Sequence, residues 1–217
     1  MSDSRAMILE RVRAALAADP ERRSAPPSLP AVLAGRPVPE AERYERFRTT
    51  LERVGGRVER LASLEAARAR VRQLVRERRV GQVSVSDAPA LEPLVQLLLP
   101  EVEVVVPAFS REEQLASEIG ITCAQWGIAE TGTLVLESAR ERHRLASLLP
   151  PVHVALLPAR ALLGTLGEAL AAVRTSTGAP ASRTITLVTG PSRTADIELT
   201  LVVGVHGPRE LHVLVHD

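Results

Sequence analysis

Segments with the pattern of β-strands alternate with segments with the pattern of α-helices over most of the chain, and this limits the folds that it can adopt. The clearest strand is the valine-rich run Val102–Val106. A near-continuous apolar run is typical of a strand buried on both faces, because a strand with one face in water carries apolar residues only at alternate positions. The alternation therefore predicts an α/β fold with a mainly parallel sheet covered on both faces.

The remaining elements follow from the same two periodicities. Strands are expected at residues 57–61, 80–86, 133–137, 152–157, 185–188 and 211–216. Helices are expected at residues 40–54, 63–78, 87–99, 110–120, 159–173 and 195–203. Residues 121–130 fit neither pattern, and residues 175–182 are expected to form a loop.

The first 39 residues differ from the rest. Ser4–Ala18 has the pattern of an amphipathic helix, and residues 20–39 hold six prolines, which is typical of a linker or an arm. We therefore expect an N-terminal helix and Pro-rich linker over residues 1–39 and an α/β domain over residues 40–217. The arm could pack on a second subunit and support an oligomer, or fold back onto its own domain. We expect that it can be removed without unfolding the domain.

Composition and charge argue against several functions. The chain has 217 residues, 45% of them hydrophobic, which suits one domain with an N-terminal extension. Its 27 basic and 26 acidic residues give a net charge of +1, so nothing in the bulk charge favours nucleic acid. No apolar run is long enough to span a membrane, and no signal-peptide pattern is seen, so we expect a cytoplasmic protein.

Cysteine and histidine usage argues against a metal or a cluster in this chain. Cys123 is the only cysteine, and a lone thiol in apolar surroundings is expected to be inert. His153 is expected to be a hydrogen-bonded core imidazole, and His212 and His216 are expected to point outward on the last strand. No pair of histidines lies four residues apart on an expected helix, and a single cysteine cannot form a zinc site, so we expect no metal site.

One stretch near the C-terminus has the pattern of a ligand site. The expected strand at residues 185–188 ends at Gly190, and Ser192, Arg193 and Thr194 then bring two hydroxyls and a fixed positive charge. If a helix begins at residue 195, free N–H groups at its start would attract an anion, with Asp196 orienting Arg193 or accepting from a ligand hydroxyl. The simpler alternative is a turn in which Ser192 or Thr194 caps the helix.

Two further candidates lie in other segments. Glu130 precedes Thr131, Gly132 and Thr133, where the glycine permits close backbone approach and the hydroxyls can orient a carboxylate or a phosphate. Glu130 could act as a base, a nucleophile or a hydrogen-bond acceptor, or lie exposed on a hairpin turn. His206 is the histidine best placed for a site, because glycines lie close on both sides, although it could equally pack the turn.

Three sequence blocks, taken in order, resemble the LUD-domain family, and specifically its lactate utilization protein C type. They are Gly127–Ser138, Ser147–Val154 and Thr189–Pro208. The resemblance covers about residues 40–217. It implies a three-layer α/β/α sandwich with a mainly parallel sheet, similar to the CoA-transferase, ribose-5-phosphate isomerase and glucosamine-phosphate isomerase group. One departure is Gln125-Trp126, where the family pattern has an acidic residue followed by tyrosine.

The resemblance also implies a role in oxidising L-lactate to pyruvate beside iron–sulfur partner proteins. This chain has neither a G-x-G-x-x-G fingerprint after a strand nor cysteines for a cluster, so we expect no cofactor in it and clusters only in the partners. We expect a subunit that binds a small anion or a partner at the C-terminal ends of the strands.

Two other functions stay open. One is a stand-alone acyl-CoA or sugar-phosphate enzyme with Glu130 as the catalytic residue, and the other is an interaction module with a vestigial pocket. The expected binding residues are Thr131, Gly132, Thr133, Gly190, Ser192, Arg193, Thr194, Asp196 and His206.

Overall fold

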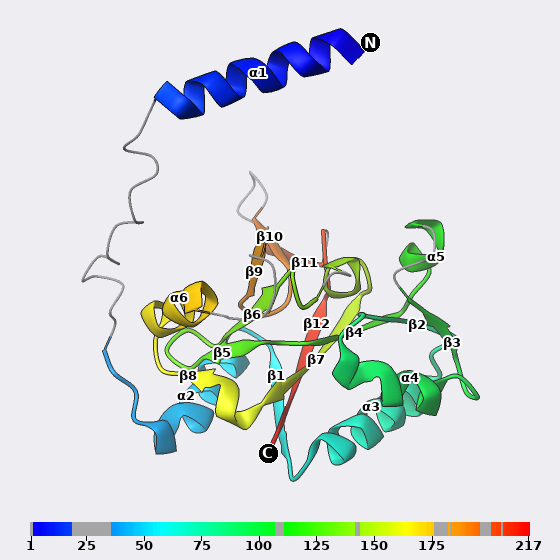
Figure 1. Cartoon of the computed structure of the whole chain (residues 1–217). Coiled ribbons are helices and arrows are strands. Elements are labelled where there is room, and N and C mark those ends of the chain that lie inside the picture. The colour runs from blue at the N-terminus through cyan, green and yellow to red at the C-terminus, as the bar shows by residue number, and fades with distance from the viewer. Residues whose placement is uncertain are drawn as a thin grey trace. The chain divides into compact units, whose positions relative to one another are not determined.

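The computed structural model describes residues 2–18, 36–106, 111–141, 144–175, 182, 184–195, 201–204 and 206–217 (Figure 1). The chain divides into two compact units, Met1–Pro30 and Ala31–Asp217. The first contains helix α1 (Ser2–Ala18), where the sequence predicts a helix. The predicted division at residue 39 stays a prediction. Asp196 and most of the Pro-rich linker lie outside the described residues.

The second unit is built on a six-stranded sheet in which every neighbouring pair is parallel. The strand order is β1-β12-β7-β4-β2-β3. The strands are β1 (Arg57–Leu61), β12 (Glu210–His216), β7 (Val152–Pro158), β4 (Ile119–Cys123), β2 (Gln82–Val85) and β3 (Glu103–Val105). The predicted parallel sheet is therefore confirmed.

Helices α3 (Leu64–Arg78) and α4 (Glu92–Leu98) cover one face of this sheet (Figure 1). Ser63 caps α3 as predicted, because its hydroxyl accepts a hydrogen bond from the backbone N–H of Ala66 at 3.2 Å. The core on this face includes Val71, Leu91, Ile121 and Val154. This helical layer buries one face of the strands, as expected for a sheet that is covered on both faces.

The other face is covered by helix α2 (Glu40–Arg53) and by a second, four-stranded sheet. Its order is β8 (Leu162–Leu163), β5 (Trp126–Ile128), β6 (Thr133–Glu137) and β9 (Ile185–Val188). Helix α6 (Leu166–Thr175) packs on the far side of this small sheet. The unit is thus a three-layer α/β/α sandwich, with the small sheet inserted between the parallel sheet and α6.

Three predicted helices are wrong in part or whole. The segment 159–173 forms a short 3₁₀ turn and β8 before α6 starts at Leu166. Helix α5 (Arg111–Leu115) ends before residue 120, and Gly120 lies in β4. Residues 193–203 contain the antiparallel pair β10 (Arg193–Ala195) and β11 (Leu201–Val203) in place of a helix.

The reason for the last error can be read in the sequence. Apolar residues stand at positions 197, 199, 201 and 203, which is the period of a strand, and residues 200, 202 and 203 are β-branched. The prediction that His212 and His216 point outward is also wrong. They are 7% and 8% exposed, because they alternate with the residues that face α2 and so lie on the face covered by α3.

Gly120 tests how tightly β4 is packed. A Cβ at this position would overlap the carbonyl oxygen of Ala146, which belongs to the 3₁₀ turn Arg144–Ser147. We expect Gly120→Ala to lower the free energy of unfolding by at least about 2 kcal/mol, because backbone rather than a flexible side chain must move. Urea unfolding measures this.

The matched control is Gly81→Ala, where the nearest atom to the new Cβ would be Glu118 Oε1 at 3.6 Å, an ordinary contact. We expect this control to change the free energy of unfolding by less than about 1 kcal/mol. Equal effects of the two substitutions would contradict the packing described for β4.

Candidate functional site

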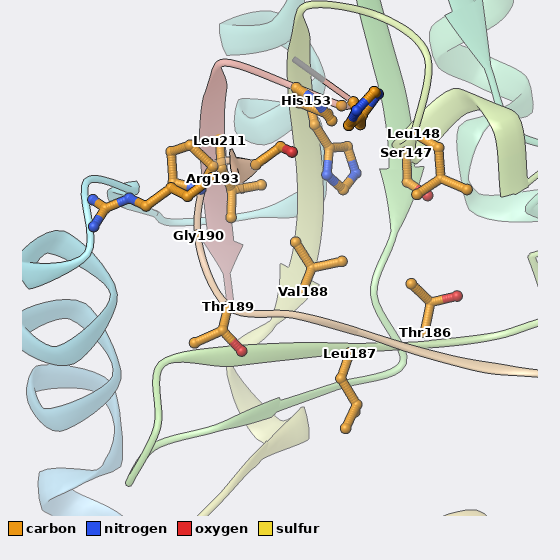
Figure 2. A pocket seen from close by; sticks show the side chains of 15 residues that line it. Ser147, Leu148, His153, Thr186, Leu187, Val188, Thr189, Gly190, Arg193 and Leu211 are labelled. Atoms are coloured by element: carbon orange, nitrogen blue, oxygen red, sulfur yellow. The ribbon is translucent and has the colours of Figure 1, made fainter. Parts of the chain in front are cut away.

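A cleft of about 370 Å³ opens between the parallel sheet and strand β9 (Figure 2). Three groups of residues line it: residues 186–193, residues 206–208, and the set Ser147, Leu148, His153 and Leu211. All of them except Thr186, Leu187, Val188 and Leu211 come from the second and third sequence blocks. Two of the three blocks, far apart in the sequence, therefore build one cleft.

The cleft does not lie at the expected end of the parallel sheet. His153 and Leu211 stand at the amino ends of β7 and β12, and they are paired in register. The cleft runs along β9 and past its carboxyl end, but β9 belongs to the small sheet, where its partner β6 is antiparallel. Anion binding at the carboxyl ends of the parallel strands is therefore not supported by the position of this cleft.

The predicted helix start at this site is also wrong. Arg193 begins strand β10, so the N–H groups of a helix N-terminus are not available after Gly190. The positive charge of Arg193 remains. Ser192 is held by its backbone, whose N–H donates to the carbonyl of Pro208 at 2.8 Å and whose carbonyl accepts from the N–H of Gly204 at 2.9 Å. These bonds fix the two loops that form one side of the cleft.

Arg193 reaches the end of helix α2. Its Nη2 donates a hydrogen bond to the carbonyl oxygen of Val54, and Figure 2 shows the guanidinium directed toward that helix and away from the His153 ring. A cation is favourable there, because the last carbonyls of a helix carry partial negative charge. The guanidinium has five N–H donors, and the bond to Val54 uses one of them.

The first sequence block meets the cleft through a chain of hydroxyls. Thr131 Oγ1 lies 2.7 Å from Thr133 Oγ1, which lies 2.7 Å from Thr189 Oγ1 on the cleft wall. Gly132, with φ of +65°, packs so closely on α2 that a Cβ would lie 2.5 Å from the backbone nitrogen of Leu51. Thr131, Gly132 and Thr133 thus support the cleft wall from behind.

Glu130 lies elsewhere. Its Oε1 accepts a hydrogen bond from the backbone N–H of Leu166 at 2.7 Å, which caps the start of α6. It also lines a separate cleft of about 470 Å³ with Arg36, Glu42 and Arg46, and the two clefts share no residue. The structure therefore does not bring Glu130 together with Arg193 and His206.

His206 is exposed and lines the first cleft, where the sequence places a site. Gly207 beside it has little room for a side chain, since a Cβ would lie 3.0 Å from Ser192 Cβ. The side chain of Thr194 and all of Asp196 lie outside what the structure describes. Their predicted roles stay predictions.

His153 is the cleft residue whose importance the sequence did not reveal. Its ring is fully buried, with Nε2 2.8 Å from Thr122 Oγ1, and burial lowers its pKa to about 4. The ring is therefore neutral at pH 7. The prediction of a hydrogen-bonded core imidazole is confirmed, but the residue also lines the cleft. Its position within the second sequence block is the feature of the sequence that could have identified it as a cleft residue.

A second buried group lies at the carboxyl end of β4. Glu141 is 3% exposed, and its Oε1 accepts from the backbone N–H of Cys123 at 2.7 Å. Burial raises the pKa of Glu141 to about 7, and burial together with Glu141 raises the pKa of the Cys123 thiol to about 12. The thiol is thus protonated at neutral pH, in line with the inert cysteine that the sequence predicts.

These observations define a class of protein: an α/β/α sandwich with a small mixed sheet and a cleft between the two sheets. A solved structure of a DUF162 family protein from Deinococcus radiodurans is similar, with a TM-score of 0.62 and 22% identity over 83% of this chain and 100% of that chain. At this identity the likeness concerns the fold.

The LUD domain family model matches residues 44–216, and the chain belongs to that family. Among curated relatives, lactate utilization protein C from Exiguobacterium sp. is 40% identical over 114 residues, which is 51% of this chain and 50% of the relative. Lactate utilization protein C from Bacillus subtilis is 38% identical over 104 residues, 46% of this chain and 43% of the relative. The chain spans about half the length of these relatives in each match.

Glu141 makes the stability of the protein depend on pH. Its pKa rises from 4.5 in a free chain to about 7 in the fold, so the folded state holds the proton more tightly. Its contribution to stability is therefore full below about pH 4.5 and is lost as the pH rises through about 7. We expect Glu141→Gln to gain up to about 3 kcal/mol over the wild-type protein between these pH values.

Urea unfolding of both proteins at pH 4.5, 6 and 8 measures this difference. The lowered pKa of His153 makes stability change with pH in the opposite direction. Because His153 is present in both proteins, its effect cancels in the difference between them. Gln keeps the oxygen that accepts from Cys123. A difference that does not change with pH would contradict the buried, protonated state of Glu141.

Proposed function

We propose that this chain is a subunit of a cytoplasmic system that oxidises L-lactate to pyruvate and that it binds a small anion or a partner in the cleft. The observation that carries the proposal is the convergence of the sequence blocks. The second and third blocks line the cleft, and the first is bonded to its wall through Thr133 and Thr189. The names of the curated relatives support a role in lactate utilization.

Groups suited to an anion stand at this cleft. Arg193 carries a fixed charge, and its bond to Val54 engages one of its five N–H donors. His206 is exposed, and Ser192 contributes a hydroxyl. The position of Arg193 at the end of α2 means that its guanidinium must turn to meet a ligand in the cleft. We therefore place the anion at the side of the cleft where Arg193 and Ser192 meet.

Removing two electrons from lactate requires an electron acceptor. A single cysteine, here partly buried, cannot hold an iron–sulfur cluster. In the described part of the chain, no group of three or more His, Cys, Asp and Glu side chains could hold a metal ion. We propose that partner proteins carry the clusters and that the N-terminal arm, residues 1–39, takes part in association. None of the helices in the described ranges has the length and apolar character to cross a membrane.

Growth on L-lactate of a strain that lacks this protein, complemented with variants, tests the proposal. We expect Arg193→Ala to impair growth, because losing a charge-assisted hydrogen bond should weaken an anionic ligand by roughly 10- to 150-fold. The melting temperature should change little, since an exposed bond to Val54 contributes about 1 kcal/mol. The matched control is Arg160→Ala, an exposed arginine that lines neither cleft.

Glu130→Gln separates this proposal from a stand-alone enzyme with a catalytic glutamate. Gln keeps the oxygen that accepts from Leu166, so the fold should be kept. Normal growth of Glu130→Gln with impaired growth of Arg193→Ala supports the proposal. Normal growth of Arg193→Ala, or lost growth of Glu130→Gln with an unchanged melting temperature, contradicts it.

A further inference from the structure

In the part of the chain that the structure describes, one nitrogen of His153 is buried without a hydrogen-bond partner. Among the described residues, three buried side-chain atoms share this property: Glu137 Oε1, Glu141 Oε2 and His153 Nδ1. Of these three residues, only His153 lines one of the two clefts discussed above. A buried polar atom that is left unpaired is unfavourable, and such atoms in proteins usually meet a ligand or an ordered water.

The chemistry of this nitrogen is defined by its ring. Nε2 is already engaged with the hydroxyl of Thr122 at 2.8 Å, and the ring is neutral at pH 7. If Thr122 donates to Nε2, then Nδ1 carries the proton and is a donor; if Nε2 donates, then Nδ1 is an acceptor. A ligand hydroxyl can pair with Nδ1 in either case, because it both donates and accepts.

The surroundings of the ring favour a small ligand with an apolar part. Figure 2 shows the His153 ring extending into the space between Leu211 and the segment of Ser147 and Leu148. Leu148, Val188 and Leu211 give this part of the cleft an apolar wall. His206 is exposed and provides a polar group that can face a carboxylate.

We propose that the cleft binds a short 2-hydroxy monocarboxylate and that His153 Nδ1 binds its 2-hydroxyl group. The alkyl group packs on the apolar wall, and the carboxylate lies toward Ser192 and His206, on the side of the cleft where Arg193 stands. Because Nδ1 is buried, the ligand reaches it by displacing a wall side chain, and the partly exposed Leu148 is placed to move. This proposal rests on the proposed function, because the names of the relatives direct attention to lactate.

Calorimetric titration of the full chain with L-lactate and with propionate tests it, since propionate has the same carbon skeleton without the 2-hydroxyl. We expect lactate to bind at least about fivefold more tightly, the effect of one hydrogen bond. His153→Phe should abolish this preference. His206→Ala should weaken both ligands by the same factor and leave the preference unchanged.

Melting temperatures show whether the variants fold. If His153→Phe does not fold, the wild-type protein labelled with ¹⁵N-histidine provides the test: lactate should shift the His153 ring nitrogen signals, and propionate should not. Equal affinities for the two ligands, or a preference that survives in folded His153→Phe, would overturn the proposal. If the partner of Nδ1 is an ordered water and not a ligand, these contrary results are expected.

The two proposals fail separately. If the protein is needed for growth on lactate but shows no preference for lactate over propionate, the role of His153 is wrong and the proposed function stands. If it prefers lactate but its loss leaves growth on lactate unchanged, the proposed function is wrong and the binding site stands.

Discussion

The arrangement of the site depends on the close packing of two loops against the C-terminal turn of helix α2. Gly132 and Gly190 both have positive φ, +65° and +102°. Gly132 approaches Leu51 too closely for a side chain, and a Cβ at Gly190 would lie 3.0 Å from Val54 Cγ2. Arg193 completes the contact by donating to the carbonyl of Val54. Since α2 is itself anchored in the core by the fully buried Phe47 and Leu51, these contacts fix where the first and third sequence blocks lie.

That arrangement explains why residues predicted as one site have different roles. The threonines beside Gly132 form hydroxyl bonds that reach Thr189, so this block supports the cleft wall. Glu130, one residue before Thr131, faces the other way and caps α6. The side chains that line the cleft come mainly from the second and third blocks, where a neutral, buried His153 and an exposed His206 stand close to apolar residues.

Much of the fold could be predicted from the sequence because strands such as β7 and β12 are apolar runs and Ser63 marks the start of α3. Strand β4 was not predicted, because its residues fall between a predicted helix that ends at residue 120 and a segment that fits neither pattern. The small sheet could not be predicted: β8 has two residues, and its position depends on parallel pairing with β5. The helix predicted at residues 195–203 is wrong because the strand at 185–188 and the turn at Gly190 have the pattern that precedes a helix start at a ligand site. The alternation at residues 197–203 was the better guide. The unpaired nitrogen of His153 could not be predicted, because the surroundings of the ring depend on how β7 lies beside β4 in the fold.

The central claim is that the cleft between β9 and the parallel sheet is the ligand site of this family member. Amide chemical shifts of the ¹⁵N-labelled full chain, recorded during titration with L-lactate, test it most directly. Changes are expected to concentrate at residues 147–153, 189–193 and 206–208, with the second cleft at residues 36–46 unaffected. Changes centred on Glu130 and residues 36–46, or no changes at the first cleft at saturating lactate, would contradict it.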